Sequence, residues 1–181
     1  MTSHDPVSGP MPDPVFDQLA ALGIDHEVMA CDPALADTAD FCVAYGIDPA
    51  DSANAILVAG KAREGEDRPF ALCLVLATHR LDVNGTVRKR LGSRKASFAG
   101  ADETAAMTGM QIGGVTPFGL PDGCTVPIWI DADVMARDRV VVGGGSRDRK
   151  LLLPPVGLLA LPGAEAVQDL ARPVPPPQPE T

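Results

Sequence analysis

Aromatic side chains are scarce in this chain, since Phe, Trp and Tyr together make up only 4% of its 181 residues. A core of ordinary size therefore has to be built from Val, Leu, Ile and Ala. Histidine is scarce too, with three residues that show no metal-ligand spacing, and the four cysteines form no CxxC pair. These absences exclude the common zinc and redox motifs, so we expect neither a metal nor a cofactor.

Long apolar runs are absent as well. No window approaches the roughly 18 apolar residues that a membrane-spanning helix needs. The opening residues, MTSHDPVSGPMPDP, contain neither a basic start nor an apolar run, so no secretory signal is expected. The cysteines lie in apolar stretches and are expected to be reduced thiols that pack as small hydrophobic side chains. The sequence therefore favours a cytoplasmic protein with no membrane partner.

Basic residues are missing from the first 52 positions, which carry ten acids and neither Lys nor Arg. The other 129 residues hold all 15 basic residues against 14 acids, although the whole chain has a net charge of −9. Most of the basic residues gather in two stretches, 80–95 and 137–150. This distribution argues against DNA or a long duplex as a partner but allows a short phosphate-bearing ligand, such as the end of a tRNA. A solvated surface is the alternative for each stretch.

The two ends differ in composition from the rest of the chain. Residues 1–13 are rich in Pro, Gly, Ser and Asp and are expected to form a disordered arm. Residues 172–181, with the sequence RPVPPPQPET, are expected to form a disordered polyproline tail. A single domain is then expected over residues 14–171.

Hydrophobic periodicity and turn residues predict an uneven order of helices and strands. Helices are expected over residues 14–22, 36–45, 87–91 and 102–108. Strands are expected over residues 26–31, 53–59, 70–77, 95–98, 126–131, 139–142 and 150–153. The runs 53–59 and 70–77 are apolar on both faces and are expected to be adjacent central strands of a hairpin. This order predicts an α+β domain around a curved or barrel-like sheet, without regular βαβ winding.

A glycine-rich loop, GGVTPFG, occupies residues 113–119. Gly113 and Gly114 allow close approach of a ligand to backbone N–H groups, and Pro117 stiffens the loop. Such a loop can direct amides toward a carboxyl, carbonyl or phosphate oxygen, with Thr116 and Phe118 as candidate substrate contacts. A structural turn is the alternative. The loop is neither a Walker motif nor a dinucleotide fingerprint.

A second glycine cluster follows the apolar strand 139–142. Gly143, Gly144 and Gly145 predict either a bulge or a bare backbone surface that a ligand can approach. Arg147, two residues further on, is a candidate for bidentate binding of a phosphate or carboxylate. A purely structural strand end is the alternative reading of this cluster.

Two isolated polar residues complete the set of candidates. Asp131 ends the apolar strand VPIWID and is expected either to cap the next turn or to orient a substrate amine. Asn54 is the strongly polar residue in the apolar run ANAILVA, and it is expected either to pin a neighbouring loop or to face a pocket. There is no GxSxG motif and no evident histidine pair, so no activated protein nucleophile is predicted.

These motifs together resemble the YbaK/ProX-type aminoacyl-tRNA deacylases, a family that includes the editing domain of bacterial prolyl-tRNA synthetases. The similar run covers roughly residues 14–171 and includes HRLDVNGTVRKRL, FAGADETAAMTGMQIGGVTPFGLP, VPIWID and VVVGGGSRDRKLLL. The resemblance implies a mixed α+β domain with a largely antiparallel, barrel-like sheet and short flanking helices. It also implies hydrolysis of the ester between a wrong, usually small, amino acid and the 3′ adenosine of tRNA. The expected partners are the 3′ end of an aminoacyl-tRNA and an aminoacyl-tRNA synthetase.

The resemblance also assigns roles to residues. Such enzymes use no protein nucleophile: the pocket orients water, backbone amides stabilise the oxyanion and the ribose hydroxyl of the substrate assists. The family's GxxxP loop falls on Gly113 and Pro117, and Asn54 stands where active members have a lysine. Two functions follow, a trans-editing hydrolase with an altered pocket or a non-catalytic module that binds an aminoacyl group, a nucleotide or a synthetase.

Overall fold

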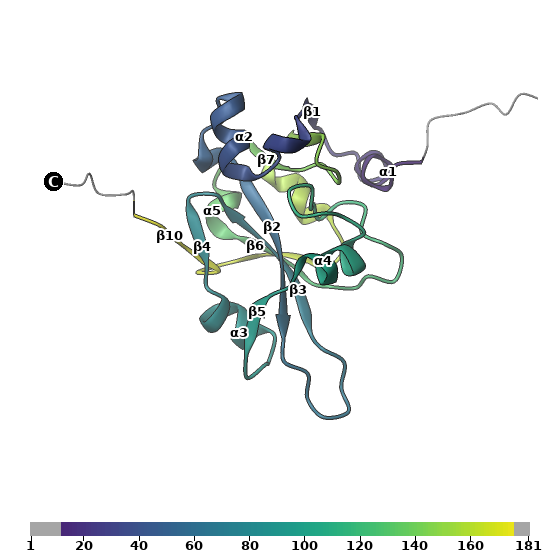
Figure 1. The fold of residues 1–181 in the computed structure, drawn as a ribbon, viewed down its shortest axis with the longest axis vertical. Coiled ribbons are helices and arrows are strands. Elements are labelled where there is room, and N and C mark those ends of the chain that lie inside the picture. Colours follow the sequence, from purple (N-terminus) through teal and green to yellow (C-terminus); the bar gives the residue numbers. More distant parts are fainter. Residues whose placement is uncertain (1–11, 176–181) are drawn as a thin grey trace, which may run out of the picture.

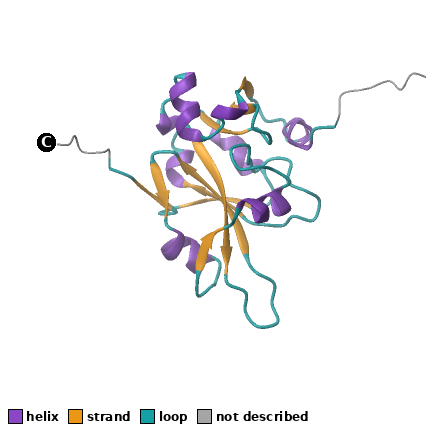
Figure 2. Cartoon of the chain, viewed as in Figure 1, coloured by secondary structure: helices purple, strands orange, loops and turns teal. Residues whose placement is uncertain are grey.

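The computed structural model describes residues 12–175, in which ten strands form three sheets surrounded by short helices (Figures 1 and 2). The largest sheet has the strand order β5-β2-β3-β6-β9. These strands span Ala96–Phe98 (β5), Ala53–Gly60 (β2), Phe70–Leu76 (β3), Ile128–Asp131 (β6) and Ala164–Val167 (β9). The β2–β3 and β2–β5 pairs are antiparallel, whereas β3–β6 and β6–β9 are parallel. The predicted central hairpin is therefore confirmed.

Two smaller sheets complete the strand structure. One has the order β1-β8-β7 and the other pairs β10 with β4, all antiparallel. Their bounds are Glu27–Ala30 (β1), Arg149–Leu153 (β8), Val140–Gly143 (β7), Ala171–Pro173 (β10) and His79–Leu81 (β4). A single parallel bridge from Ser52 to Val141 joins the β1-β8-β7 sheet to the start of β2. The α+β prediction is confirmed, but the described strands do not close into a barrel.

Short helices connect and flank the sheets, as the sequence predicts. The α-helices are Pro14–Ala21 (α1), Thr38–Tyr45 (α2), Arg88–Arg90 (α3), Ala101–Thr108 (α4) and Ala132–Met135 (α5). Short 3₁₀-helices lie at Pro33–Leu35 (η1), Pro49–Asp51 (η2) and Pro155–Ala160 (η4). A short π-helix lies at Val83–Val87 (η3), directly before α3. Gly46 and Gly109 end α2 and α4 in the left-handed conformation that glycine adopts without strain.

The core lies on both faces of the five-stranded sheet because side chains alternate along each strand. On β3, Leu72 and Leu74 face one apolar cluster, and Ala71 and Cys73 face the other. Burial raises the pKa of the Cys73 thiol to about 12. All four cysteines are free thiols, as expected from their apolar surroundings.

The predicted disordered ends are partly structured. Asp13 caps α1, accepting a hydrogen bond from the Val15 N–H at 3.1 Å, and its carboxylate pairs with Arg149 at 2.6 Å. Strand β10 extends to Pro173, because its pairing with β4 gives backbone partners to a segment of weak apolar content. The predictions are therefore wrong at Asp13 and at residues 172–173. Most of the predicted arm and tail lies outside the described residues.

None of the helices within residues 12–175 has the length and apolar character required to cross a membrane.

Candidate functional site

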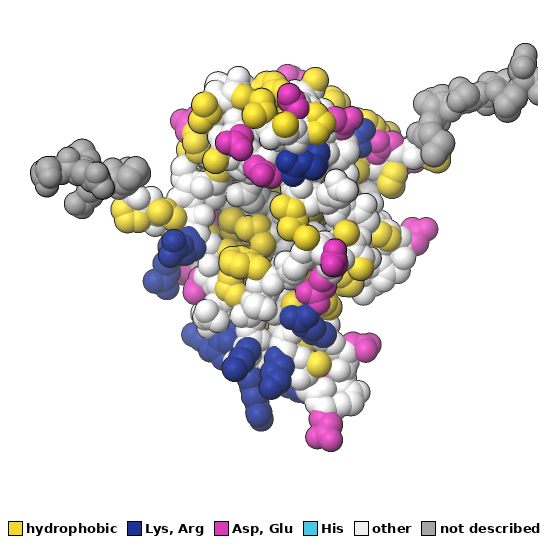
Figure 3. Space-filling view, in the orientation of Figure 1, with side chains coloured by type: hydrophobic (Ala, Val, Ile, Leu, Met, Phe, Trp, Pro, Cys, Tyr) yellow, Lys and Arg dark blue, Asp and Glu magenta, His cyan; other side chains and the backbone are white. Residues whose placement is uncertain are grey.

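A cavity of about 270 Å³ lies between β2, α2, the loop after α4 and the β7–β8 hairpin. Figure 3 shows it as a hollow with hydrophobic side chains near the middle of the face in view. Apolar side chains supply most of its wall, and Asp37 and Lys150 are the charged residues that line it. The cavity therefore suits a small ligand with an apolar part and an electron-rich polar part.

Asn54 lines this cavity from β2, as one of its two predicted alternatives requires. Its side-chain oxygen accepts a hydrogen bond from the Thr38 hydroxyl at the start of α2. With the oxygen so occupied, the amide nitrogen is the group that remains to donate to a ligand. Asn54 thus combines both predicted roles, since it fixes α2 and also faces the cavity.

Lys150 is a cavity residue that the sequence analysis missed. It lies on β8 with only 6% of its surface exposed, and its ammonium group donates to the carbonyl oxygens of Ala36 and Gly113, each at 2.6 Å. It also lies 5.4 Å from the centre of the Phe41 ring. Burial is the main cause that lowers its pKa, and the nearby Arg147 lowers it further. The sequence gives no signal that singles it out, because Lys150 is the last of four consecutive charged residues, Arg147 to Lys150.

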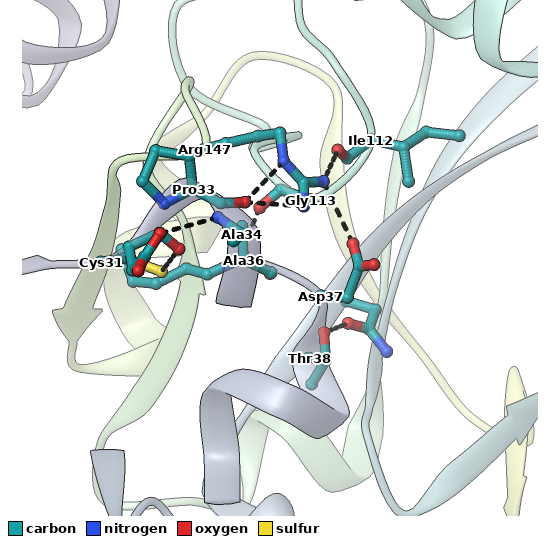
Figure 4. Close-up of polar contacts among 12 residues, drawn as sticks. Cys31, Pro33, Ala34, Ala36, Asp37, Thr38, Ile112, Gly113 and Arg147 are labelled. Atoms are coloured by element: carbon teal, nitrogen blue, oxygen red, sulfur yellow. Dashed lines mark hydrogen bonds and ion pairs between the residues drawn. The ribbon is translucent and has the colours of Figure 1, made fainter. Parts of the chain in front are cut away.

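Arg147 has a different role from the predicted one. Its guanidinium donates to the carbonyl oxygens of Pro33 and Ile112, at 2.9–3.0 Å and 2.7 Å, and pairs with Asp37 at 3.1 Å. Figure 4 shows it between these groups. These contacts use its donors within the protein. Arg147 and Lys150 together tie the glycine-rich loop to the segment before α2, and so fix two walls of the cavity.

The two glycine clusters pack against each other. The Gly145 N–H donates to the Gly114 carbonyl at 2.8 Å, and a Cβ on Gly114 would lie 2.6 Å from the carbonyl carbon of Ser146. A Cβ on Gly143 would clash with the carbonyl oxygen of Val115. These residues are therefore glycines because two backbones meet. The Gly114 N–H, a predicted donor to a ligand, donates instead to the Gln111 carbonyl oxygen at 2.9 Å.

Only part of each cluster reaches the cavity. Gly113 and Gly143 line it, whereas Gly114, Gly144 and Gly145 do not. Within the described chain, no backbone carbonyl accepts from the N–H groups of Gly113 and Val115. Both of these residues line the cavity. The N–H groups of Gly113 and Val115, rather than that of Gly114, are therefore the candidate donors to a ligand oxygen.

The predicted contacts further along the loop are buried away from the cavity. Thr116 and Phe118 are fully buried, Phe118 belongs to the main apolar cluster, and Pro117 is buried beside them. None of the three lines the cavity. The prediction that Thr116 and Phe118 contact substrate, and that Pro117 acts directly, is not supported by this geometry. They anchor the loop instead.

Asp131 also serves the fold. It is 2% exposed, and its two carboxylate oxygens accept hydrogen bonds from the N–H groups of Asp133 (3.0 Å) and Ala171 (2.8 Å). It therefore caps α5 and holds the start of β10, the first of its two predicted alternatives. With His79 and Asp133 it brings three possible metal ligands within 4.8 Å, but both of its oxygens already accept backbone donors.

Comparison with known proteins supports the predicted resemblance. Residues 32–161, more than half of the chain, match the family described as the aminoacyl-tRNA editing domain. A solved structure of a hypothetical protein has a TM-score of 0.75 at 21% identity, covering 88% of this chain and 100% of that one. A second, described as a candidate trans-editing enzyme for prolyl-tRNA synthetase, has a TM-score of 0.70 at 25% identity, covering 85% of this chain and 92% of that one. This chain therefore belongs to the aminoacyl-tRNA editing domain family.

Proposed function

We propose that this protein is a trans-editing hydrolase that cleaves the ester between a small amino acid and the 3′ adenosine of a mischarged tRNA. The observation that carries the proposal is the cavity beside Asn54, with its apolar wall and one buried ammonium group. Its volume of about 270 Å³ lies below the ~300–1,000 Å³ typical of pockets for drug-sized ligands. A small aminoacyl group fits this size. The cytoplasmic location expected from the sequence agrees with such a role and remains a prediction.

The chemistry follows from what lines the cavity. Its lining residues include neither cysteine nor a histidine that could activate the hydroxyls of Thr38, Ser52 and Thr104, and in this proposal the nucleophile is water. Water attacks the ester carbonyl, the bond from the carbonyl carbon to the ribose oxygen breaks, and the proton of the water passes to that oxygen. In this proposal the oxyanion that forms is stabilised by the N–H groups of Gly113 and Val115, which line the cavity and have no backbone acceptor among the described residues.

Lys150 adds positive charge near that oxyanion. Two of the three ammonium N–H donors serve the carbonyls of Ala36 and Gly113, which leaves one for a ligand. No carboxylate lies within ion-pair distance of Lys150 among the described residues. Because its charge is not neutralised by direct contact and is largely removed from water, its field acts strongly inside the cavity. Asn54 then orients the substrate through its amide nitrogen.

A non-catalytic binding module is the second candidate, and the bond between Thr38 and Asn54 favours it. That bond restrains Asn54, and an amide carries no charge with which to stabilise an oxyanion. In this alternative the cavity binds an aminoacyl group without cleaving its ester.

A hydrolysis assay separates the two functions. The protein is incubated with tRNAs charged with Ala, Ser, Cys or Pro, and loss of the ester is compared with the uncatalysed rate. We expect faster loss for at least one small amino acid and a slower rate for Asn54→Ala. If no charged tRNA loses its ester faster than in buffer while the protein still binds one of them, the binding module is correct and the hydrolase proposal fails.

A further inference from the structure

The two basic stretches of the chain differ in what they contact. In residues 137–150, four arginines pair with carboxylates from the acidic first part of the chain. Arg137 pairs with Asp51 at 2.5 Å. Arg139 pairs with Glu27 at 2.5 Å. Arg147, Arg149 and Lys150 have the internal partners described above. Every basic residue of this stretch is therefore engaged within the protein. The prediction that this stretch contacts a phosphate-bearing ligand is therefore disfavoured.

The stretch 80–95 has few internal partners. Arg90 pairs with Glu165 and lies 4.8 Å from the centre of the Trp129 ring. Lys89, Arg94 and Lys95 are exposed and have no ion pair within residues 12–175. Figure 3 shows Lys and Arg side chains gathered in the region of α3 and β5, while Asp and Glu are more frequent near α2. An otherwise acidic protein thus carries a concentrated basic surface, here called the α3–β5 surface and comprising residues 88–95.

Strand β5 connects the α3–β5 surface to the cavity. Its last residue, Phe98, lines the cavity although 57% of its surface is exposed, and Ile112 on the rim is 52% exposed. Lys95 lies three residues before Phe98, about 10 Å along an extended strand. The mouth of the cavity therefore has an exposed aromatic ring on the side of the basic surface. Aromatic rings in such a position stack on the unpaired bases of single-stranded RNA.

We propose that the α3–β5 surface and Phe98 bind the single-stranded 3′ end of an RNA. The terminal base stacks on Phe98, and the preceding phosphates lie against Lys89, Arg94 and Lys95. The group esterified to the terminal ribose then enters the cavity. This inference rests on the proposed function for the ester, but the binding of uncharged RNA is independent of hydrolysis.

Binding is measured with fluorescent, uncharged tRNA and the full-length chain. We expect Phe98→Ala to weaken binding by about 5- to 150-fold, the range usual for loss of a stacking aromatic, and Phe98→Trp to retain it. Phe98→Leu keeps an apolar side chain at the rim and is expected to behave like Phe98→Ala. Thermal melting of each variant separates lost stacking from lost folding.

The salt dependence tests the phosphate contacts. Each phosphate contact to a single strand contributes about 0.7 to the slope of log K against log salt concentration. Arg94→Gln combined with Lys95→Gln is therefore expected to reduce that slope by about 1.4. Arg139→Gln removes a charge from the other basic stretch and serves as the matched control, with little change in slope. Equal effects of the two sets of substitutions would overturn the proposal.

A tRNA that lacks its terminal adenosine tests the position of the base. We expect the parent protein to bind it more weakly than intact tRNA and the Phe98→Ala variant to bind both equally. If the parent does not discriminate, or binds neither RNA, the inference is wrong even where the ester is hydrolysed. If RNA binds as expected but no ester is cleaved, the inference holds and the proposed hydrolase activity fails.

Discussion

Replacing Lys150 with methionine tests whether the buried ammonium group acts on the ligand or only on the fold. Methionine keeps an unbranched apolar stem but leaves the carbonyls of Ala36 and Gly113 without their donor. An unsatisfied buried group costs about 1–3 kcal/mol. The variant also removes the penalty of burying a charge, which is several kcal/mol in typical interiors. Because the two effects oppose each other, we expect the free energy of unfolding to change by less than about 2 kcal/mol.

The expected effect on hydrolysis is much larger. Loss of one group that stabilises an oxyanion typically lowers the rate about 10²–10³-fold. Lys150→Met should therefore nearly abolish ester cleavage while the protein remains folded. Lys61→Met, which alters an exposed lysine outside the cavity, is the control and should change neither property. Thermal melting and the ester assay are run on both variants.

The pH dependence gives a second test of Lys150. Burial lowers its pKa below the ordinary 10.5, so between the lowered pKa and 10.5 the unfolded chain binds more protons than the folded one. Stability contributed by this group therefore increases with pH across that window. The melting temperature of the parent should therefore increase relative to that of Lys150→Met as the pH rises through this window. Hydrolysis above the uncatalysed rate should fall in the same window, because the ammonium loses its proton. Parent-like activity of a folded Lys150→Met protein would refute the electrostatic role.

Three further substitutions test the assignments of structural roles. Gly114→Ala places a Cβ 2.6 Å from the Ser146 carbonyl carbon and should cost about 1–3 kcal/mol of stability; an unchanged melting temperature would contradict the close packing of the two glycine clusters. Asp131→Ala removes the acceptor of two backbone N–H groups and should lower the melting temperature by several degrees, with the activity per folded molecule unchanged. Asp13→Ala should lower stability by about 0.5–2 kcal/mol through loss of the α1 cap, and a variant as stable as the parent would argue that the cap contributes little.

The longer elements could be predicted because their sequence patterns are strong. The strands β2 and β3 are apolar on both faces, and that pattern is typical of central strands. The strands β4, β9 and β10 were missed, although β1, β5, β6 and β7 are equally short and were predicted. The missed segments, HRL, AEAV and ARP, contain charged residues or proline and no apolar run, and they form strands here because a neighbouring strand supplies backbone partners.

The site could be predicted only in part, for a related reason. A glycine indicates that a Cβ has no room, but it does not say whether a ligand or another backbone fills the space. At Gly113 the Arg147 guanidinium fills that space, whereas at Gly114 and Gly143 the backbone of the other glycine-rich segment fills it. Lys150 was missed because its partners, Ala36 and Gly113, are distant in sequence. Only the tertiary structure makes it a residue of the cavity.

The presence of Lys150 changes what a lysine at position 54 would do. Both positions line the same cavity. Two ammonium groups about 8 Å apart repel by about 2 kcal/mol at an effective dielectric constant of 20. Asn54→Lys alone should therefore destabilise the protein and lower the pKa of Lys150 further. Combining Asn54→Lys with Lys150→Met removes the repulsion and restores one charge, so the double variant should cleave the ester faster than Lys150→Met alone. If the double variant is folded and as slow as Lys150→Met, the charge acts from the position of Lys150 alone, and Asn54 and Lys150 are not interchangeable.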